Sequence, residues 1–325
     1  MIDGIQITKQ LYNDKIKYTS LEHISSGQYG DRYKLRTSSN AKYNGNNPIV
    51  TITNRNKLVI KGSLPYLFSD NNLIPFSLGE VKEAFKDLSN RIGIDLNDAI
   101  VNNFEFGVTV TTPFSFKEFV HHHLSLSKMD SSAYRNKGKY FQDKNIRIKL
   151  YDAGRNAKYK LSKPLRQSLS KKGKYDVNFN YVKFEIQYKN PFKHFGQVIK
   201  VDDLIDPDFL WLCTEDLLNT YKKIRKTGFK IPVTAKELTT AKILAITLKE
   251  LEQLTDVDVE KLVEEKIKTL SLLKSWQKYD RRKSIRKAFG NLTLGSSSPY
   301  DIYNLLEDAT VEFLHSGKNN KSITY

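Results

Sequence analysis

Three segments in which apolar and polar residues alternate strictly constrain the fold more than any other feature of the sequence. They are Asn103–Val110, Asn145–Asp152 and Tyr181–Tyr188. A period of two residues is the pattern of a β-strand that buries one face and leaves the other face polar. If the three strands belong to one antiparallel sheet, one surface of that sheet is apolar and the opposite surface carries charged and hydrogen-bonding side chains.

Other segments in the first two-thirds of the chain predict a hairpin and short helices. Residues 48–60 carry apolar residues on both sides of Asn54–Asn56, which favours two strands joined by a turn. Two residue pairs have the spacing of a capping box, in which two side chains satisfy the first free backbone groups of a helix. These pairs are Ser77 with Glu80, before a helix to about Ile92, and Ser115 with Glu118, before a helix through His123.

From about Asp202 the apolar residues recur every 3.6 positions, which predicts helices. The expected helical features are the face Leu210, Cys213, Leu217 and Tyr221, a third capping box at Thr234 and Glu237, a segment from Val257 toward Phe289 with a break, and a last segment from Pro299 to Phe313. We therefore predict an α+β chain with an antiparallel-sheet domain at 1–200, a helical region at 201–316 and a flexible tail at 317–325.

The charge of the chain indicates a polyanionic partner. The sequence has 53 Lys and Arg residues against 36 Asp and Glu residues, a formal net charge of +17. Nucleic acid is favoured over a membrane surface, because the charge is scattered and no long basic amphipathic helix stands out. A protein that is merely basic is the alternative.

Cysteine content and apolar runs bear on the compartment. Cys213 is the single cysteine, so no disulfide can form within the chain and no zinc site can be built from cysteine pairs. The N-terminal residues lack the apolar stretch of a signal peptide, and no apolar run could span a bilayer. We expect a cytoplasmic protein with no membrane partner.

The polar surface of the predicted sheet carries side chains suited to cutting a phosphodiester. Glu105, Glu185 and Tyr151 occupy polar-face positions, together with Arg147 and Lys149. Carboxylates bind Mg²⁺ or Mn²⁺, a phenolate can attack phosphorus, and cations can hold the flanking phosphates. The alternative is a solvated sheet face with ordinary cross-strand pairs.

Three motifs carry a likeness to a known family. They are Phe104–Val108, Ile148–Gly154 and Val182–Ile186, and an upstream segment, Lys61–Pro65 followed by Asp70–Asn72, is similar as well. Together they span about residues 50–190. In order and spacing they resemble the filamentous-phage gene II replication initiators and the related phage and plasmid replication proteins, whose second motif is often written Tyr-Asp-Lys-Gly.

This resemblance implies a rolling-circle initiator that nicks one strand at a replication origin in a bacterial cytoplasm. By it, Tyr151 is the nucleophile, which keeps the 5′ end as a phosphotyrosine, leaves a 3′-OH primer and later allows rejoining. Glu105 and Glu185 are the candidate ligands of a divalent metal, Mg²⁺ or Mn²⁺. The implied partners are double- and single-stranded origin DNA and the host helicase and polymerase.

Two positions depart from the family pattern. Asn103 stands where the family often has an arginine, and Ala153 stands where a lysine is expected after Tyr-Asp. The missing cation would then come from Lys149, which we take as a catalytic candidate, or from Arg155 or Lys158. Asp152 would point into the other face of a regular strand, so we expect it to have a structural role.

The DNA-binding candidates form two groups. One group is near the proposed site and the other is on a basic segment with interleaved aromatic residues, which suits a phosphate backbone or a base-stacking platform. The candidates are Arg147, Arg155, Lys158 and Lys183 in the first group, and Arg281, Arg282, Arg286 and Lys287 in the second. The alternative for the second group is a solvated helix face.

The histidines are weaker metal candidates. We expect His121–His123 to lie on a helix, where residues two apart diverge, and His194 to lie in a loop after Glu185. The alternative is that His121 and His123 share one face of a strand and bind a metal, or that His194 approaches the metal site. Two other functions remain open for the whole chain. One is a non-catalytic origin-binding protein or repressor, and the other is a basic structural protein of a phage.

Overall fold

The computed structural model describes residues 2–36, 48–69, 71–74, 76–134, 137–226, 243–244, 247–248, 259–290 and 300–316. They fall into two compact units. The larger unit is drawn from residues 1–120, 126–223 and 302–325, and the smaller unit from residues 121–125 and 224–301.

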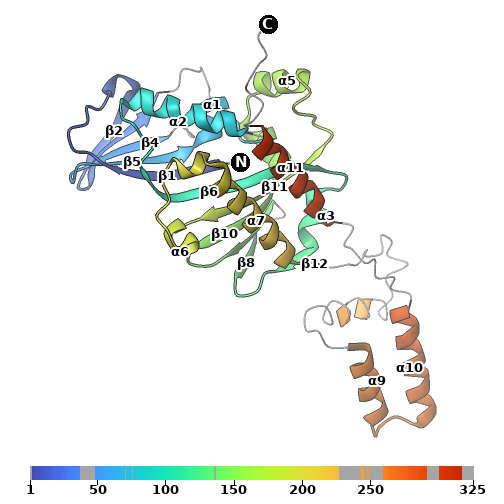
Figure 1. Cartoon of the computed structure of the whole chain (residues 1–325). Helices are drawn as coiled ribbons and strands as arrows, with labels where there is room; N and C mark the ends of the chain where they lie inside the picture. The colour runs from blue at the N-terminus through green and yellow to red at the C-terminus, as the bar shows by residue number, and fades with distance from the viewer. Residues whose placement is uncertain are drawn as a thin grey trace. The chain divides into compact units, whose positions relative to one another are not determined.

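An antiparallel sheet of ten strands forms the larger unit within the described residues (Figure 1). Its order is β2-β3-β4-β5-β1-β6-β11-β10-β9-β8. The strands are β1 (Ile2–Gln10), β2 (Leu21–Gly27), β3 (Gly30–Leu35), β4 (Ile49–Thr53), β5 (Lys57–Ser63), β6 (Ile100–Thr112), β8 (Asp130–Tyr134), β9 (Gly138–Gln142), β10 (Ile146–Asp152) and β11 (Asn180–Tyr188). The three alternating segments are β6, β10 and β11, and β11 pairs with both of the others. The α+β class is thereby confirmed.

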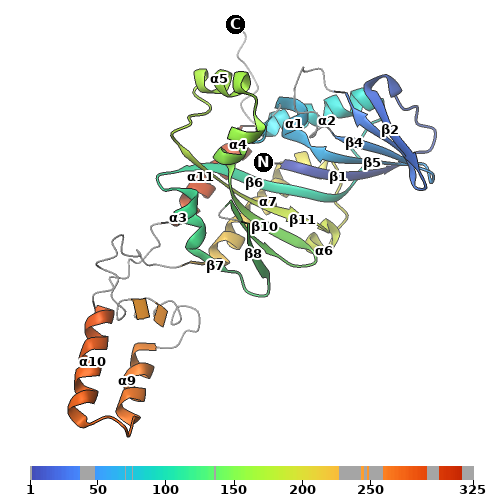
Figure 2. The same ribbon diagram turned by 180° about the vertical axis from the view of Figure 1, so that it is seen from behind.

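Helices cover the sheet on both sides. Those of the larger unit are α1 (Leu64–Ser69), α2 (Leu78–Ile92), α3 (Phe116–His121), α4 (Ala153–Lys160), α5 (Lys163–Lys171), α6 (Pro191–Phe195), α7 (Pro207–Lys223) and α11 (Tyr303–His315), with α3 ending at the border between the units. Helices α7 and α11 lie in front of the central strands in Figure 1, and α4 lies in front of them in the reverse view of Figure 2. The sheet therefore has two differently covered faces.

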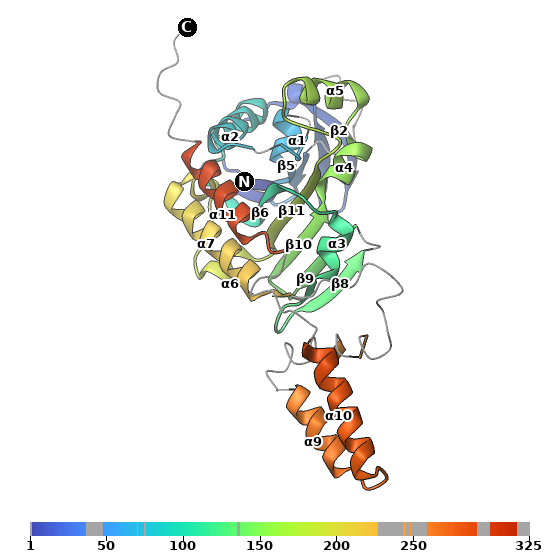
Figure 3. The ribbon, with the colours of Figure 1, turned by 90° about the vertical axis from the view of Figure 1, so that its right-hand side faces the viewer.

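The apolar face is the core of the larger unit. The ring of Phe106 on β6 lies 6.0 Å from that of Phe313 on α11, and Phe184 on β11 lies 5.2 Å from Tyr221 on α7. Figure 3 shows these two helices together on one side of β6, β11 and β10. Burial of such aromatic side chains is the main stabilising contribution, about 25 cal/mol per Å² of apolar surface.

Local signals in the sequence explain several element ends. The predicted turn joins β4 to β5, and Asn56 takes the left-handed conformation there with φ of 52°. The Ser77–Glu80 capping box opens α2, which ends at Gly93 with φ of 79°. The expected face of α7 is buried as predicted, with Cys213 fully enclosed.

Three expectations need comment. The helix after Ser115 ends at His121, and His123 begins β7 (His123–Ser125), because this segment pairs with β12 (Arg225–Lys226). The last helix begins at Tyr303, while its expected start lies outside the described residues. The third capping box and the tail at 317–325 also lie outside them.

The packing divides the chain differently from the predicted boundary at residue 200. Helices α7 and α11 contact β6 and belong to the unit of the sheet. The cause is their buried faces, which the apolar surface of the sheet covers. The functional division at residue 200 stays a prediction.

The smaller unit contains β7, β12, α9 (Val259–Thr269) and α10 (Ser275–Gly290). The predicted break between its two helices is present, and α9 packs against α10. We call these two helices the α9–α10 pair. Among the described residues, no helix of either unit has both the length and the apolar character needed to cross a membrane.

Candidate functional site

A cavity of about 740 Å³ opens on the polar face of the central strands. Its wall is built by β1, β5, β6, β9, β10 and β11 of the sheet, together with α1 and α4. Five residues singled out in the sequence line it: Glu105, Arg147, Lys149, Tyr151 and Glu185. Their assembly follows from the register, because Lys149 on β10 lies opposite Glu185 on β11.

Three carboxylates meet in this cavity. Asp3 on β1, Glu105 on β6 and Glu185 on β11 each place an oxygen within 4.8 Å of the others. Asp3 was not among the residues predicted from the sequence. Its only signal was a polar residue between Ile2 and Ile5 in an N-terminal strand. Nothing local indicates that this strand pairs with β6, some hundred residues later in the chain.

Two ammonium groups already hold these carboxylates. Lys149 Nζ lies 2.7 Å from Glu105 Oε1 and 2.9 Å from Glu185 Oε1. Lys183 Nζ pairs with Asp3 and lies 3.1 Å from Glu185 Oε2. The formal charges of three carboxylates and two ammonium groups leave one negative charge. The cluster is therefore nearly neutral despite its three acids.

Lys183 corrects one prediction of the sequence analysis. Its side chain is only 1% exposed and is committed to Asp3 and Glu185. A lysine in this position cannot reach a DNA phosphate without leaving the buried carboxylate of Asp3 without its ion pair and taking one of two cations from Glu185, which is energetically expensive. We therefore assign Lys183 to the carboxylate cluster and not to a DNA-binding surface.

Tyr151 lies at the end of β10 beside the carboxylates. Its hydroxyl donates a hydrogen bond to Glu185 Oε2 at 3.1 Å. Asp152 ends the strand by accepting a hydrogen bond from the Arg155 backbone N–H at 2.7 Å, so it is the N-cap of α4, a structural role as predicted. The strand end and the helix start together fix the position of the tyrosine backbone.

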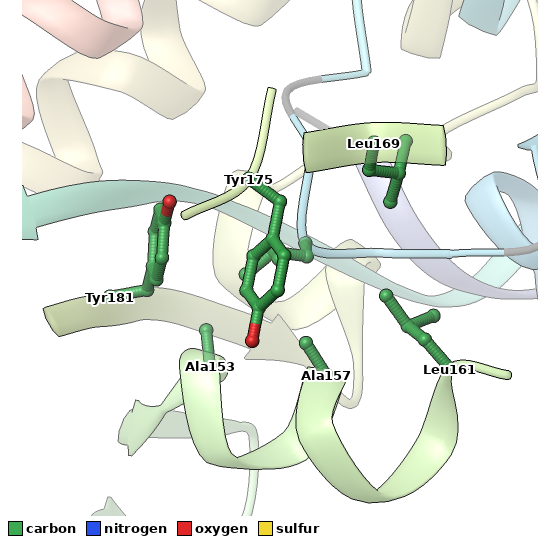
Figure 4. Close-up of a cluster of buried hydrophobic side chains, with 7 residues drawn as sticks. Ala153, Ala157, Leu161, Leu169, Tyr175 and Tyr181 are labelled. Atoms are coloured by element: carbon green, nitrogen blue, oxygen red, sulfur yellow. The ribbon is translucent and has the colours of Figure 1, made fainter. Parts of the chain in front are cut away.

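A small apolar cluster supports the Tyr151 ring. Ala153 and Ala157 project from one face of α4 toward Tyr175 (Figure 4). Tyr175 stacks on Tyr181 with 5.7 Å between ring centroids, and the Tyr151 ring packs against this cluster. The cluster limits the rotamers open to Tyr151, which keeps its hydroxyl directed at Glu185.

Two glycines let the glutamates pack closely against the neighbouring strands. A Cβ on Gly107 would lie 2.3 Å from Glu185 Cβ, so no side chain fits opposite that glutamate. A Cβ on Gly4 would lie 3.0 Å from Glu105 Cδ. The donor set, made only of carboxylate oxygens that lie within 4.8 Å of one another, fits a small, hard divalent cation such as Mg²⁺ or Mn²⁺.

The electrostatics divide the carboxylates into two kinds. Burial alone would raise the pKa of Asp3 and of Glu185, but the adjacent lysines hold both pKa values below the usual range. The pKa of Glu105 is raised, first by burial and then by the charge of Glu185. Burial and Glu185 also raise the pKa of Tyr151 well above 10. The phenol is therefore protonated at neutral pH unless positive charge is added to the site.

Of the three cations that were expected to replace the family lysine, only Lys149 lines the cavity. Ala153 is buried in the apolar cluster, which leaves no room for a lysine there. Arg155 and Lys158 are exposed on α4 and do not line the cavity, whereas Lys160 of the same helix does. Lys149 is thus the one candidate among the three that contacts the carboxylates.

The histidines do not line the cavity, although His123 begins β7 and His194 lies on α6 and not in the expected loop. His121 ends α3, and neither it nor His123 lines the cavity. His194 Nε2 lies 3.0 Å from Asp216, next to Tyr188 on the apolar side of β11. Within the described parts of the chain, the three carboxylates form the one group of metal-binding type.

The basic residues of α10 differ in how freely they could contact DNA phosphates. Glu264 on α9 holds two of them, with Arg282 Nη2 at 3.2 Å and Arg286 Nη2 at 2.8 Å. Arg281 is exposed, and the side chain of Lys287 lies outside the described residues. Of the four basic residues of α10 that were predicted to bind DNA, Arg282 and Arg286 therefore already share their charge with Glu264.

Comparisons with known proteins identify no family for this chain. No family model and no curated protein matches the chain. Among solved structures, a rolling circle replication initiator protein from Geobacillus stearothermophilus is similar, with a TM-score of 0.38 and 13% identity. The match covers 73% of this chain and 88% of that one. We infer no property of the present chain from it.

Proposed function

We propose that this chain is a rolling-circle replication initiator that nicks one DNA strand with Tyr151. The observation that carries the proposal is the hydrogen bond from the Tyr151 hydroxyl to Glu185, one of three clustered carboxylates in a cavity rimmed by cations. The order of the three sequence motifs supports the same reaction. A phenol, a proton acceptor and a phosphate-binding wall are what strand transfer through tyrosine requires.

The chemistry follows from the contacts of Tyr151. Glu185 accepts the phenol proton, and the phenol oxygen attacks the phosphorus of the scissile phosphodiester. A new bond forms between that oxygen and phosphorus while the bond from phosphorus to the 3′ oxygen breaks. Lys149 is placed to give a proton to the departing 3′ oxygen, which becomes the 3′-OH primer. The reverse sequence rejoins the strand.

Asp3, Glu105 and Glu185 are the residues that would hold the divalent metal, and Lys149 contacts two of these carboxylates. When bound, Mg²⁺ or Mn²⁺ would offset the negative charge that develops on the phosphate. The raised pKa of Tyr151 explains why added positive charge is needed before this phenol can lose its proton.

The DNA strand would follow the cations along the cavity wall. Arg147, Lys61, Lys137 and Lys160 line it and are suited to phosphate contacts. Of the four DNA-binding candidates that were predicted near the site, only Arg147 lines the cavity. Contacts of Arg281 and its neighbours on α10 with DNA, and the roles of a host helicase and polymerase, stay predictions.

A non-catalytic DNA-binding protein is the second candidate. The observation in its favour is the pairing of all three acids with Lys149 and Lys183, which also suits a purely structural cluster. The two candidates differ in one reaction, because only an enzyme leaves protein attached to a cut strand.

The test is cleavage of single-stranded origin DNA in the presence of Mn²⁺. Tyr151→Phe removes only the attacking oxygen, so we expect unchanged binding and no cleavage. Tyr140→Phe is the matched control, since Tyr140 lines the same cavity from β9. Wild-type cleavage by Tyr151→Phe would refute the assignment, and a wild-type protein that binds but never cleaves would favour the second candidate.

A further inference from the structure

The turn that joins α9 to α10, at one end of the pair, carries exposed apolar side chains (Figure 1). Leu272 is 92% exposed, more than any other large apolar side chain of the described residues, and Leu270 is 46% exposed. Trp276 and Tyr279 lie on the first two turns of α10 and are 63% and 64% exposed. Since they are three residues apart on a helix, the two rings are neighbours on one face. We call residues 266–279 the tip of the pair.

The tip is basic as well as apolar. It contains no acidic residue and four lysines, which are Lys266, Lys268, Lys274 and Lys278. Lys278 Nζ donates a hydrogen bond to the Lys268 carbonyl at 2.9 Å, so the start of α10 is tied to the end of α9. In the described part of the two helices the ion pairs join Glu264 to Arg282 and Arg286, and none includes a lysine of the tip. The positive charge of the tip is therefore available to an anionic partner.

This combination fits an anionic lipid bilayer better than it fits DNA. A DNA backbone would bind the lysines, but its phosphates offer no apolar surface to Leu270 and Leu272. At an anionic bilayer the headgroups attract lysines, and the boundary with the acyl chains accepts aliphatic side chains. Tryptophan and tyrosine are enriched at the level between, because each has an apolar ring and a polar group. Both the charge and the apolar surface of the tip therefore find a partner there.

The acids that border the tip agree with a shallow insertion. They are Glu265 on α9 and Asp280 on α10, both exposed. At a rise of 1.5 Å per residue, Glu265 lies about 6 Å from the end of α9 and Asp280 about 7.5 Å from the start of α10. Interfacial segments enter a bilayer by about 5–10 Å. An end-on approach therefore inserts the turn and leaves both acids near the headgroup surface.

We infer that the tip docks on the surface of an anionic lipid bilayer. Its lysines contact the lipid phosphates, and Leu270, Leu272 and Trp276 enter the boundary between headgroups and acyl chains. The contact is peripheral and sensitive to salt, because the attraction falls off within a Debye length, about 10 Å at ~0.1 M salt. The surface is built from two helix ends, so no long basic amphipathic helix marks it in the sequence. Docking uses no residue of the cavity and is therefore independent of the nicking reaction.

The test uses the fluorescence of Trp276 in the full chain. Trp211→Phe leaves Trp276 as the single tryptophan, because the sequence has two. The probes are vesicles of equal parts phosphatidylglycerol and phosphatidylcholine, and vesicles of phosphatidylcholine alone. A third set carries bromine on the acyl chains, which quenches a tryptophan only at contact. Vesicle titration gives the affinity, and quenching shows whether the ring enters the bilayer.

A double variant in this background removes the apolar contribution. Leu270→Ala with Leu272→Ala shortens two exposed side chains of the turn. The control is Leu262→Ala, at a leucine of α9 that is 52% exposed and lies outside the tip.

A second double variant removes part of the charge. Lys268→Gln with Lys274→Gln takes two positive charges from the tip. Its matched control, Lys82→Gln with Lys86→Gln, takes the same charge from exposed positions of α2.

We expect the emission of the background protein to shift to shorter wavelength on anionic vesicles and to be quenched by the brominated lipid. The leucine variant should bind at least about tenfold more weakly, since one buried methylene group contributes about fourfold. The lysine variant should bind about 25-fold more weakly, since each lysine near an anionic surface contributes about fivefold. Both controls should stay within about twofold of the background protein. Circular dichroism checks that each variant is folded.

Unchanged emission on anionic vesicles, or equal binding by the leucine variant and its control, would overturn the docking site. Equal affinity for neutral and anionic vesicles would contradict the role of the lysines. A shift of Trp276 emission with duplex DNA and not with vesicles would assign the tip to DNA instead. Cleavage by a protein without vesicle affinity contradicts docking alone, and vesicle binding by a protein that never cleaves contradicts the nicking reaction alone.

Discussion

Glu185 in the sheet unit and Glu264 in the α9–α10 pair are both held between two cations, but in different surroundings. Glu185 is 2% exposed and is paired with Lys149 and Lys183. Glu264 is 12% exposed and is paired with Arg282 and Arg286, whose side chains are 27% and 58% exposed. Hydrogen bonds from these arginines lower the pKa of Glu264 to about 2. Similar pairings thus occur once in a core and once at a surface.

A count of basic residues does not distinguish cations that are paired with acids of the same chain from cations that can bind DNA. Several cations that the sequence suggested for DNA are bound to acids of the same chain. At the surface such a pair contributes about 0–1 kcal/mol and its cations can exchange partners. In the core, removal of one partner strands a buried charge at a cost of about 3–5 kcal/mol. Burial therefore decides which cations are structural.

The largest expected effect is on stability. Glu185→Gln removes the carboxylate that two ammonium groups share and leaves Glu105 for Lys149 and Asp3 for Lys183, so we expect a loss of about 3 kcal/mol in the free energy of unfolding, the lower end of the range for a broken buried pair. Glu264→Gln should cost about 1 kcal/mol or less. Urea unfolding followed by tryptophan fluorescence measures both, with Trp276→Phe leaving Trp211 to report the sheet unit and Trp211→Phe leaving Trp276 to report the α9–α10 pair. Equal losses would contradict the comparison.

Glu105→Gln should have a smaller effect of opposite sign. The folded pKa of Glu105 is raised, so its stabilising contribution is present below the unfolded pKa and is lost as pH rises through the folded pKa. The variant should therefore be more stable than wild type at neutral pH without metal. The gain should vanish below about pH 4, where the carboxyl is protonated in both states.

Metal dependence provides the control for that variant. If Glu105 is a metal ligand, Mn²⁺ should raise the melting temperature of wild type and not that of Glu105→Gln, and cleavage should be lost. A variant that is less stable than wild type at neutral pH would show that the contact with Lys149 outweighs the burial of Glu105.

The next effect concerns DNA affinity. Arg281 and Lys283 are exposed on α10, and no ion pair is found for them among the described residues. If both contact duplex phosphates, changing them to Gln should flatten the plot of log affinity against log salt by up to about 1.8 units. Changing Arg282 and Arg286 should flatten it less, because Glu264 shares their charge. A salt titration showing the reverse order would contradict this division.

The smallest effect is expected at the histidines. His121→Asn and His194→Asn should each leave the cleavage rate at saturating metal within about twofold of wild type, because neither residue lines the cavity. Single-turnover cleavage measures this. Loss of metal binding in a folded His121→Asn protein would move the metal centre away from the three carboxylates.

The sequence predicts much of this site because its strands have local signatures. Strict alternation in β6, β10 and β11 was enough to place Glu105, Lys149, Tyr151 and Glu185 on one polar face. Asp3 could not be predicted, since its position depends on the pairing of β1 with β6. The ion pairs of Lys183 with Asp3 and Glu185 could not be predicted from the sequence either. Alternation shows the face on which a side chain lies and not the contacts that it makes across strands.

The sequence was less informative about the C-terminal helices. The 3.6-residue period predicted α7, and a break was predicted in the segment that contains α9 and α10, but the period did not show that α7 and α11 contact β6 and belong to the sheet unit. An apolar helix face predicts that the face is buried, but it does not identify the helix or sheet against which it packs. For the same reason, the pairing of Arg282 and Arg286 with Glu264 was not visible in the order of residues.

The most direct test of the nicking proposal is to identify the residue that becomes attached to DNA. Wild-type protein would be incubated with Mn²⁺ and a single-stranded origin oligonucleotide, digested with protease and nuclease, and analysed by tandem mass spectrometry. We predict one modified peptide, with a 5′-linked nucleotide on Tyr151. A nucleotide on Tyr66 or Tyr140, which line the same cavity, or cleavage without any covalent adduct would contradict the account.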